Sequence, residues 1–127
     1  MQYDTLTQAA ATFVCHSNLD LHIACDHLRG HYHLPVFHFD AHSNWAYARA
    51  VGQHIGFNVT KTNQLDTIAQ WMQGVPENVN YQIILYLDQT ASTAPDAMQG
   101  ARVRVEDAYT FLQSVFATNI LLIGQRA

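Results

Sequence analysis

Charged residues are scarce in this sequence, and positive charge is the scarcer sign. Only 13% of the 127 residues are charged, while 49% are hydrophobic, and six Lys and Arg against ten Asp and Glu give a formal net charge of −4 at pH 7. The six cations are scattered along the chain and form no basic stripe. A nucleic-acid-binding surface needs clustered cations that neutralise phosphates, so we expect no nucleic-acid partner.

Long apolar runs and functional cysteine spacings are also lacking. No apolar run approaches the roughly 18 to 20 residues that cross a bilayer as a helix, and the sequence from Met1 shows no charged and apolar regions of a signal peptide. The spacing of Cys15 and Cys25 suits neither a zinc site nor a redox pair, and we expect both to be buried as small hydrophobic residues. These absences predict a cytoplasmic protein with no membrane partner.

The hydrophobic content is sufficient for a folded core. A chain of 127 residues falls within the usual size of one domain and can bury a core without disulfides or a structural metal. No internal repeat and no linker composition divides the sequence. We therefore expect a single domain over residues 1–127.

The N-terminal third is predicted to form a pair of helices. From Asp4 to His16 the apolar residues recur at helical spacing. Ser17 and Asp20 match a capping box, and a second apolar stripe follows before Gly30. That stripe consists of Leu21, Ala24, Cys25 and Leu28. A strand over the same residues stays open as an alternative, because part of this segment also alternates with a period of two.

Strand and helix patterns alternate in the rest of the chain. Strands are predicted at residues 34–39, 57–61, 81–88, 101–105 and 119–124, and helices at 43–56, 63–74 and 105–116, with a loop over 89–100. Gly56 is expected to end the first of these helices in a left-handed conformation. Such alternation is typical of parallel strands joined by helical crossovers. The predicted fold class is α/β: a small three-layer sandwich, with a mostly parallel four- or five-stranded sheet, helices on both faces and the N-terminal helical pair.

Polar residues follow the predicted strands and define a candidate ligand-binding edge. In an open parallel sheet the ligand lies beyond the carboxyl ends of the strands. The candidate residues at those ends are Asp40, His42, Ser43, Lys61, Asp88 and Arg126. Polar loop residues occur at this edge in any α/β domain, so their convergence is expected even without a function.

The segment around Asp40 is also a candidate metal site. If the strand continued, its period of two would place His38, Asp40 and His42 on one side, with Asp88 as a fourth ligand from a neighbouring strand. Imidazole and carboxylate ligands suit divalent Zn, Mn or Fe, which could activate a water for hydrolysis. The alternative is that these histidines are solvated polar residues, since the surface of this chain uses little charge.

The order of the predicted elements is similar to that of response-regulator receiver domains. The similarity covers Asp40 at one strand end, a helix closing at Gly56, and Asp88 at the end of a buried strand. The resemblance implies that Asp40 belongs to a magnesium-binding acidic pair and that Asp88 accepts phosphate. Ala41 stands where the second acidic residue is expected, and Arg126 stands in place of the usual Lys, so the domain would be a degenerate receiver-like regulatory domain.

No complete catalytic constellation is present. The sequence has no glycine-rich phosphate loop and no serine nucleophile elbow. The leading hypothesis is therefore a non-catalytic domain that binds a small molecule or a protein partner, with self-association into a homodimer as a further expectation. Trp45 and Trp71 are expected to pack helices onto the sheet, whereas an exposed tryptophan would mark a partner surface.

Overall fold

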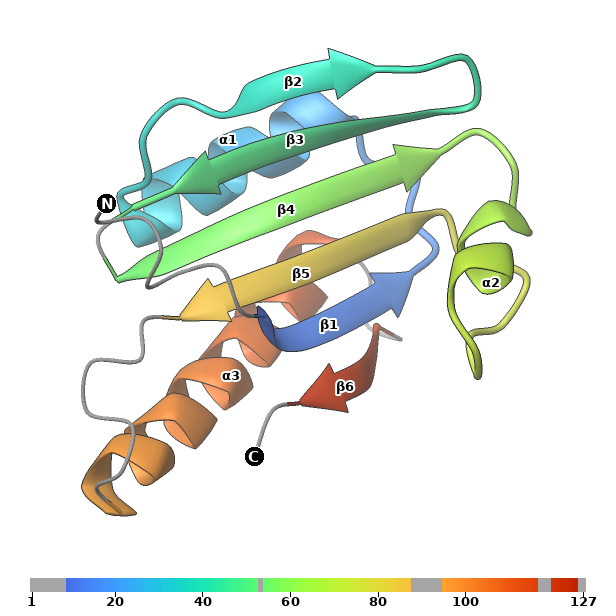
Figure 1. Ribbon diagram of the computed structural model, residues 1–127. Coiled ribbons are helices and arrows are strands. Elements are labelled where there is room, and N and C mark those ends of the chain that lie inside the picture. The colour runs from blue at the N-terminus through green and yellow to red at the C-terminus, as the bar shows by residue number, and fades with distance from the viewer. Residues whose placement is uncertain (1–8, 53, 88–94, 117–119, 126–127) are drawn as a thin grey trace.

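Six strands and three helices make up the described part of the protein. The computed structural model describes residues 9–52, 54–87, 95–116 and 120–125 (Figure 1). The strands are β1 (Ala9–Cys15), β2 (His38–Ala41), β3 (Trp45–Val51), β4 (Ile55–Thr62), β5 (Tyr81–Leu87) and β6 (Leu121–Gln125). The helices are α1 (Leu21–Tyr32), α2 (Thr67–Trp71) and α3 (Pro95–Val115).

All six strands belong to one antiparallel sheet in the order β2-β3-β4-β5-β1-β6. The predicted fold class, a mostly parallel three-layer α/β sandwich, is therefore wrong. Periodicity marks where strands lie but not their direction, and here β2, β3 and β4 follow one another through short turns. Such turns join antiparallel neighbours, whereas a parallel pair needs a long crossover. The resemblance to receiver domains assumed a parallel sheet, so the antiparallel sheet removes its basis.

The two longer helices cover the same face of the sheet. In Figure 1 α1 and α3 lie behind the strands, while α2 lies at one end of the sheet. The main core joins residues of α1 and α3, such as Leu28 and Leu112, to Phe13, Phe57 and Ile83 of the sheet. A second, small core packs α2 against the opposite face and is formed by Val14, Ile68 and Val79, with Met72, Val75 and Ile123 around it. Apart from that end, we call this opposite side the open face.

The predicted N-terminal helical pair is half right. The second helix exists as α1, and its buried residues are the four predicted from the apolar stripe. Its N-cap is Asp20, whose carboxylate accepts from the backbone N–H groups of His22 and Ile23, rather than Ser17. The helix runs past Gly30 and ends at His33, which adopts the left-handed conformation (φ 56°).

The first helix of that predicted pair is instead strand β1. The predicted helix at residues 43–56 is also wrong, because this segment contains strand β3. In both segments alanine spaced among larger residues imitates a helical stripe. In β1, Thr12, Phe13 and Val14 are β-branched or aromatic, and in β3 the alanines Ala48 and Ala50 alternate with larger side chains. A sheet whose helices pack closely accepts alanine on its inner face, so packing overrides helix propensity here.

Several smaller expectations are also corrected. Residues 101–105 lie inside α3 rather than in an edge strand, and the first strand after α1 begins at His38 rather than at residue 34. Gly56 lies within β4, and among the described glycines only Gly74 has a positive φ (80°). The strand β5 alternates between buried and half-buried residues instead of being covered equally on both faces.

The remaining predicted elements are present. Strands β4, β5 and β6, the short α2 and the second half of α3 lie where the sequence predicted them. None of the helices in the described residues combines the length and the apolar character needed to traverse a bilayer.

Candidate functional site

The register of the sheet arranges polar and aromatic side chains in rows across the open face. Residues that pair directly across antiparallel strands share a face. One row runs through Asp40, Tyr47, Thr60, Gln82 and Val14. Val14 packs under α2, away from the core formed by α1 and α3, so this row lies on the open face. The neighbouring row runs through His38, Arg49, Asn58, Ile84 and Thr12.

Four rings gather at one end of this face, and we call them the aromatic cluster: His42, Trp45, Tyr47 and Trp71. The imidazole of His42 stacks on Trp45 with ring centroids 4.1 Å apart, and Trp45 lies 5.7 Å from Tyr47. Trp71 meets Trp45 edge to face at 5.4 Å and is 45% exposed. Thr62 and Thr60, which pair with Trp45 and Tyr47, are buried. The rings therefore form the outer layer of this end of the sheet.

A tight hairpin positions the cluster. The backbone N–H of His42 donates to the carbonyl of Trp45 at 2.7 Å, so Ser43 and Asn44 form a two-residue turn between β2 and β3. The carbonyl of Asn44 accepts from Asn63 at 2.8 Å, which ties the turn to the segment that leads into α2. This connection brings Trp71 of α2 against Trp45 of β3.

The centre of the open face carries a guanidinium stacked on a ring. Arg49 of β3 reaches diagonally over β4, and its Cζ lies 4.8 Å from the centroid of Tyr86 on β5. Gly56 pairs with Tyr86 and places no side chain between the two strands. A Cβ at Gly56 would lie 3.1 Å from the carbonyl oxygen of Ala50, closer than an ordinary contact. The Oδ1 atom of Asn58, opposite Arg49, is shielded from solvent and has no hydrogen-bond partner within the described residues.

The residues predicted for a site at Asp40 are partly brought together. Asp40 and His42 lie 3.4 Å apart, measured from Oδ2 to Nε2, and both are exposed. His38 shares the face of Asp40, and Ser43 lies exposed in the hairpin turn. Asp40 thus belongs to the rim of the aromatic cluster.

Two other predicted residues, Asp88 and Arg126, lie outside the described residues, and Lys61 lies elsewhere. Lys61 shares the helix-covered side of the sheet with Tyr81, and its Nζ donates to the carbonyl of Leu19 at 2.9 Å. The expected meeting of Asp40 with Asp88 assumed parallel strands. In the antiparallel sheet the end of β2 lies level with the beginning of β5 and not with its end at Leu87.

No metal centre lies among the described residues. Across residues 9–52, 54–87, 95–116 and 120–125, no three side chains of His, Cys, Asp or Glu gather closely enough to hold a metal ion. Asp40 and His42 would supply two ligands, and the proposed fourth ligand, Asp88, lies beyond the described ranges.

The two cysteines are confirmed as buried residues of the main core. Burial raises the pKa of each thiol to about 12. Burial also raises the pKa of the neighbouring Tyr81 hydroxyl, which donates to the carbonyl of Leu19 at 2.5 Å. Thiols that stay protonated at neutral pH are poor nucleophiles, so Cys15 and Cys25 act as packing residues.

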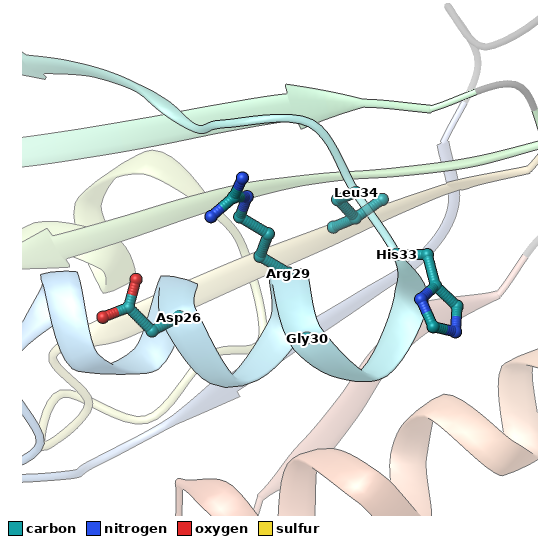
Figure 2. Close-up of a pocket in the computed structure, with 5 residues that line it drawn as sticks. All are labelled: Asp26, Arg29, Gly30, His33 and Leu34. Atoms are coloured by element: carbon teal, nitrogen blue, oxygen red, sulfur yellow. The ribbon is translucent and has the colours of Figure 1, made fainter.

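A separate hollow lies on the opposite side of the molecule, at the C-terminal half of α1. It has a volume of about 420 Å³ and is lined by Asp26, Arg29, Gly30, His33 and Leu34. Figure 2 shows Asp26 and Arg29 projecting from the helix and His33 at its end. Four of these five residues are exposed, so the hollow offers solvated polar groups rather than a dry pocket.

Comparison with known proteins identifies no relative. No family model matches the chain, and no curated protein and no solved structure matches it.

Tyr47 and Arg49 of the open face were not among the candidate site residues predicted from the sequence. Trp45, Tyr47 and Arg49 alternate with alanines along β3, which is a period of two that could have indicated a strand with a large polar and aromatic face. The expectation that Trp45 and Trp71 pack a helix onto the sheet holds for α2, because the two rings meet at 5.4 Å, but Trp45 contributes from strand β3 rather than from a helix.

Proposed function

We propose that this protein is a non-catalytic binding domain, and that its open face receives a protein partner at the aromatic cluster. The observation that carries the proposal is the half-exposed Trp71 standing against Trp45 beside Tyr47. Residues that dominate protein–protein binding energy are enriched in Trp, Tyr and Arg. The open face concentrates all three types on one side of the sheet.

The rim of the cluster supports the same proposal. Asp40 and His42 are exposed polar groups beside the half-buried rings of Trp45 and Tyr47. An interface with an aromatic centre and a polar rim has this composition. A small ligand is bound in a concave site that encloses most of its surface, whereas a sheet face presents its rings side by side to a larger partner.

The chemistry of the described side chains favours binding over catalysis. The two thiols are buried and have raised pKa values, so neither supplies a nucleophile at neutral pH. Free buried cysteines also suit a reducing compartment, which supports the proposal that the protein is cytoplasmic.

Selection from a displayed peptide library tests this proposal. We expect peptides selected on the wild-type protein to lose at least tenfold in affinity for Trp71→Ala. The matched control is Ile23→Ala, which removes a side chain of similar exposure (49% against 45%) from α1 on the other side of the molecule. Peptides that bind Trp71→Ala as tightly as the wild type, or that respond only to Ile23→Ala, would overturn the proposal.

A further inference from the structure

Arg49 is a cation on the open face without an anionic partner among the described residues. Asp40 on this face contacts the imidazole of His42, and no described carboxylate lies within 4.0 Å of the Arg49 guanidinium. Its side chain is half-buried rather than extended into solvent. A surface arginine usually keeps its charge in water or beside a carboxylate, so this placement calls for an explanation.

We infer that the guanidinium of Arg49, stacked over Tyr86, receives a carboxylate presented by the protein partner. This inference rests on the proposed function and names the chemistry that the partner must carry at the centre of the face. The ligand is a single Asp or Glu side chain.

The geometry favours a carboxylate because a guanidinium offers parallel N–H donors in one plane. The Cζ of Arg49 lies over the ring of Tyr86, 4.8 Å from its centroid, and a guanidinium in such a contact can still donate its N–H groups to an acceptor. A carboxylate accepts two such bonds at once, and the pairing is stronger where water is partly excluded.

Charge complementarity limits the partner to one carboxylate rather than an acidic stretch. The chain has a formal net charge of −4, so a highly acidic segment is repelled as it approaches. Asp40 adds a negative charge to the rim of the same face. The rings of the aromatic cluster next to Arg49 favour an apolar or aromatic neighbour of that carboxylate.

The amide of Asn58 lies opposite Arg49 on β4. Its Oδ1 atom pairs with no donor although solvent does not reach it. A buried polar atom without a partner costs free energy in the unbound protein. A carboxylate accepts hydrogen bonds and donates none, so the Oδ1 atom of Asn58 does not take part in the inferred pairing.

Nuclear magnetic resonance of the arginine side chains tests the inference. The probe is acetyl-phenylalanyl-glutamic acid amide, and its neutral isostere is acetyl-phenylalanyl-glutamine amide. The Nε–H signal of Arg49 is identified by its loss in Arg49→Lys, and the signal of Arg29 on α1 serves as an internal control. We expect a saturable shift of the Arg49 signal with the glutamic acid probe, at least threefold weaker binding of the glutamine probe, and no shift of Arg29.

The outcomes separate this inference from the proposed function. If the indole signals of Trp45 and Trp71 shift with both probes while Arg49 does not, the face binds partners but the carboxylate assignment is wrong. If neither the indoles nor Arg49 respond, both proposals fail. Asp88→Asn is measured in parallel without a probe. A shift of the Arg49 signal in that variant would show that a carboxylate of this chain occupies the site, which overturns a partner-supplied one.

Discussion

Two asparagines beside the central strands differ in what surrounds their amides. Asn80 precedes β5 and is buried; its Oδ1 accepts from the N–H of Ser17 at 2.9 Å, and its Nδ2 donates to the carbonyl of Ser17 at 2.8 Å. Asn58 in β4 has a shielded Oδ1 with no such partner in the described part of the chain. The same residue type therefore stabilises the protein at one position and costs free energy at the other.

Substitutions at these two positions should change stability in opposite directions. Asn80→Ala leaves the buried backbone groups of Ser17 unpaired and should lower the free energy of unfolding by about 2–4 kcal/mol. Asn58→Val removes an unsatisfied acceptor and adds a β-branched side chain to a strand, so it should raise that free energy by about 1 kcal/mol. Urea unfolding measures both, with the exposed Asn78→Ala as control. A loss of stability in Asn58→Val would show that its amide is satisfied after all.

At the scale of elements, the sequence predicted the strands and helices whose apolar residues fit either the helical period or the strand period of two, but not both. The alternation in β4 and the apolar runs of β5 and β6 each have a single interpretation, whereas the α1 stripe ending at Leu28 was predicted as a helix with a strand left open as an alternative. The failures are β1 and β3, where alanines occupy the inner face of the sheet. Alanine fits a helical stripe and the inner face of a closely packed sheet equally well. Which of the two forms depends on the helices that pack over the sheet, and the local pattern does not show this packing.

Two glycines provide a direct test of local conformation. At Gly30, inside α1, and at Gly74, after α2, an added Cβ would meet no atom within 4 Å. They differ in backbone angle, since Gly74 has a φ of +80°. Gly30→Ala should stabilise the protein by about 0.5–1 kcal/mol, because alanine loses less entropy in a helix. Gly74→Ala should destabilise it by about 1–2 kcal/mol, because its φ is left-handed. Thermal unfolding of both variants measures this, and shifts of the same sign would contradict it.

At the scale of the whole molecule, the position of the candidate site depended on strand direction. Hydrophobic patterns place a strand and its buried face, but they do not specify the neighbour or its orientation. Asp40 was therefore found as a site residue by its place at a strand end, while its companions proved to be Trp45 and Tyr47 on the adjacent strand. Lys61, which was expected at the same edge, instead holds Leu19 on the helix-covered side.

The buried thiols predict that the protein loses stability in alkali. Burial raises the pKa of Cys15 and of Cys25 from 9.0 to about 12, and that of Tyr32 from 10.0 to about 12, where Asp107 adds to the effect. Above pH 9 the unfolded chain loses these protons first, so stability that is complete below pH 9 declines up to about pH 12. At pH 10 each thiol accounts for roughly 1.4 kcal/mol.

Urea unfolding at pH 8 and pH 10 measures this decline. The wild type should lose more free energy of unfolding between the two pH values than Cys15→Ala, which lacks one titrating thiol. The comparison uses the difference between pH values, so the small cavity left by the substitution cancels. Identical losses in the two proteins would exclude a contribution from this thiol.

The place of β1 between β5 and β6 has a consequence for the order of folding. Strands β2, β3 and β4 can pair as soon as they leave the ribosome, because each pairs with a strand that is adjacent to it in the sequence. Strand β1, with Phe13 and Val14, leaves the ribosome earlier but can pair on one edge only after β5 has emerged. Its other edge can pair only after β6 has emerged. Among the described strands, β1 is thus the first to be synthesised and one of the last to be paired on both edges, and its apolar residues stay accessible to chaperones until β5 and β6 are available.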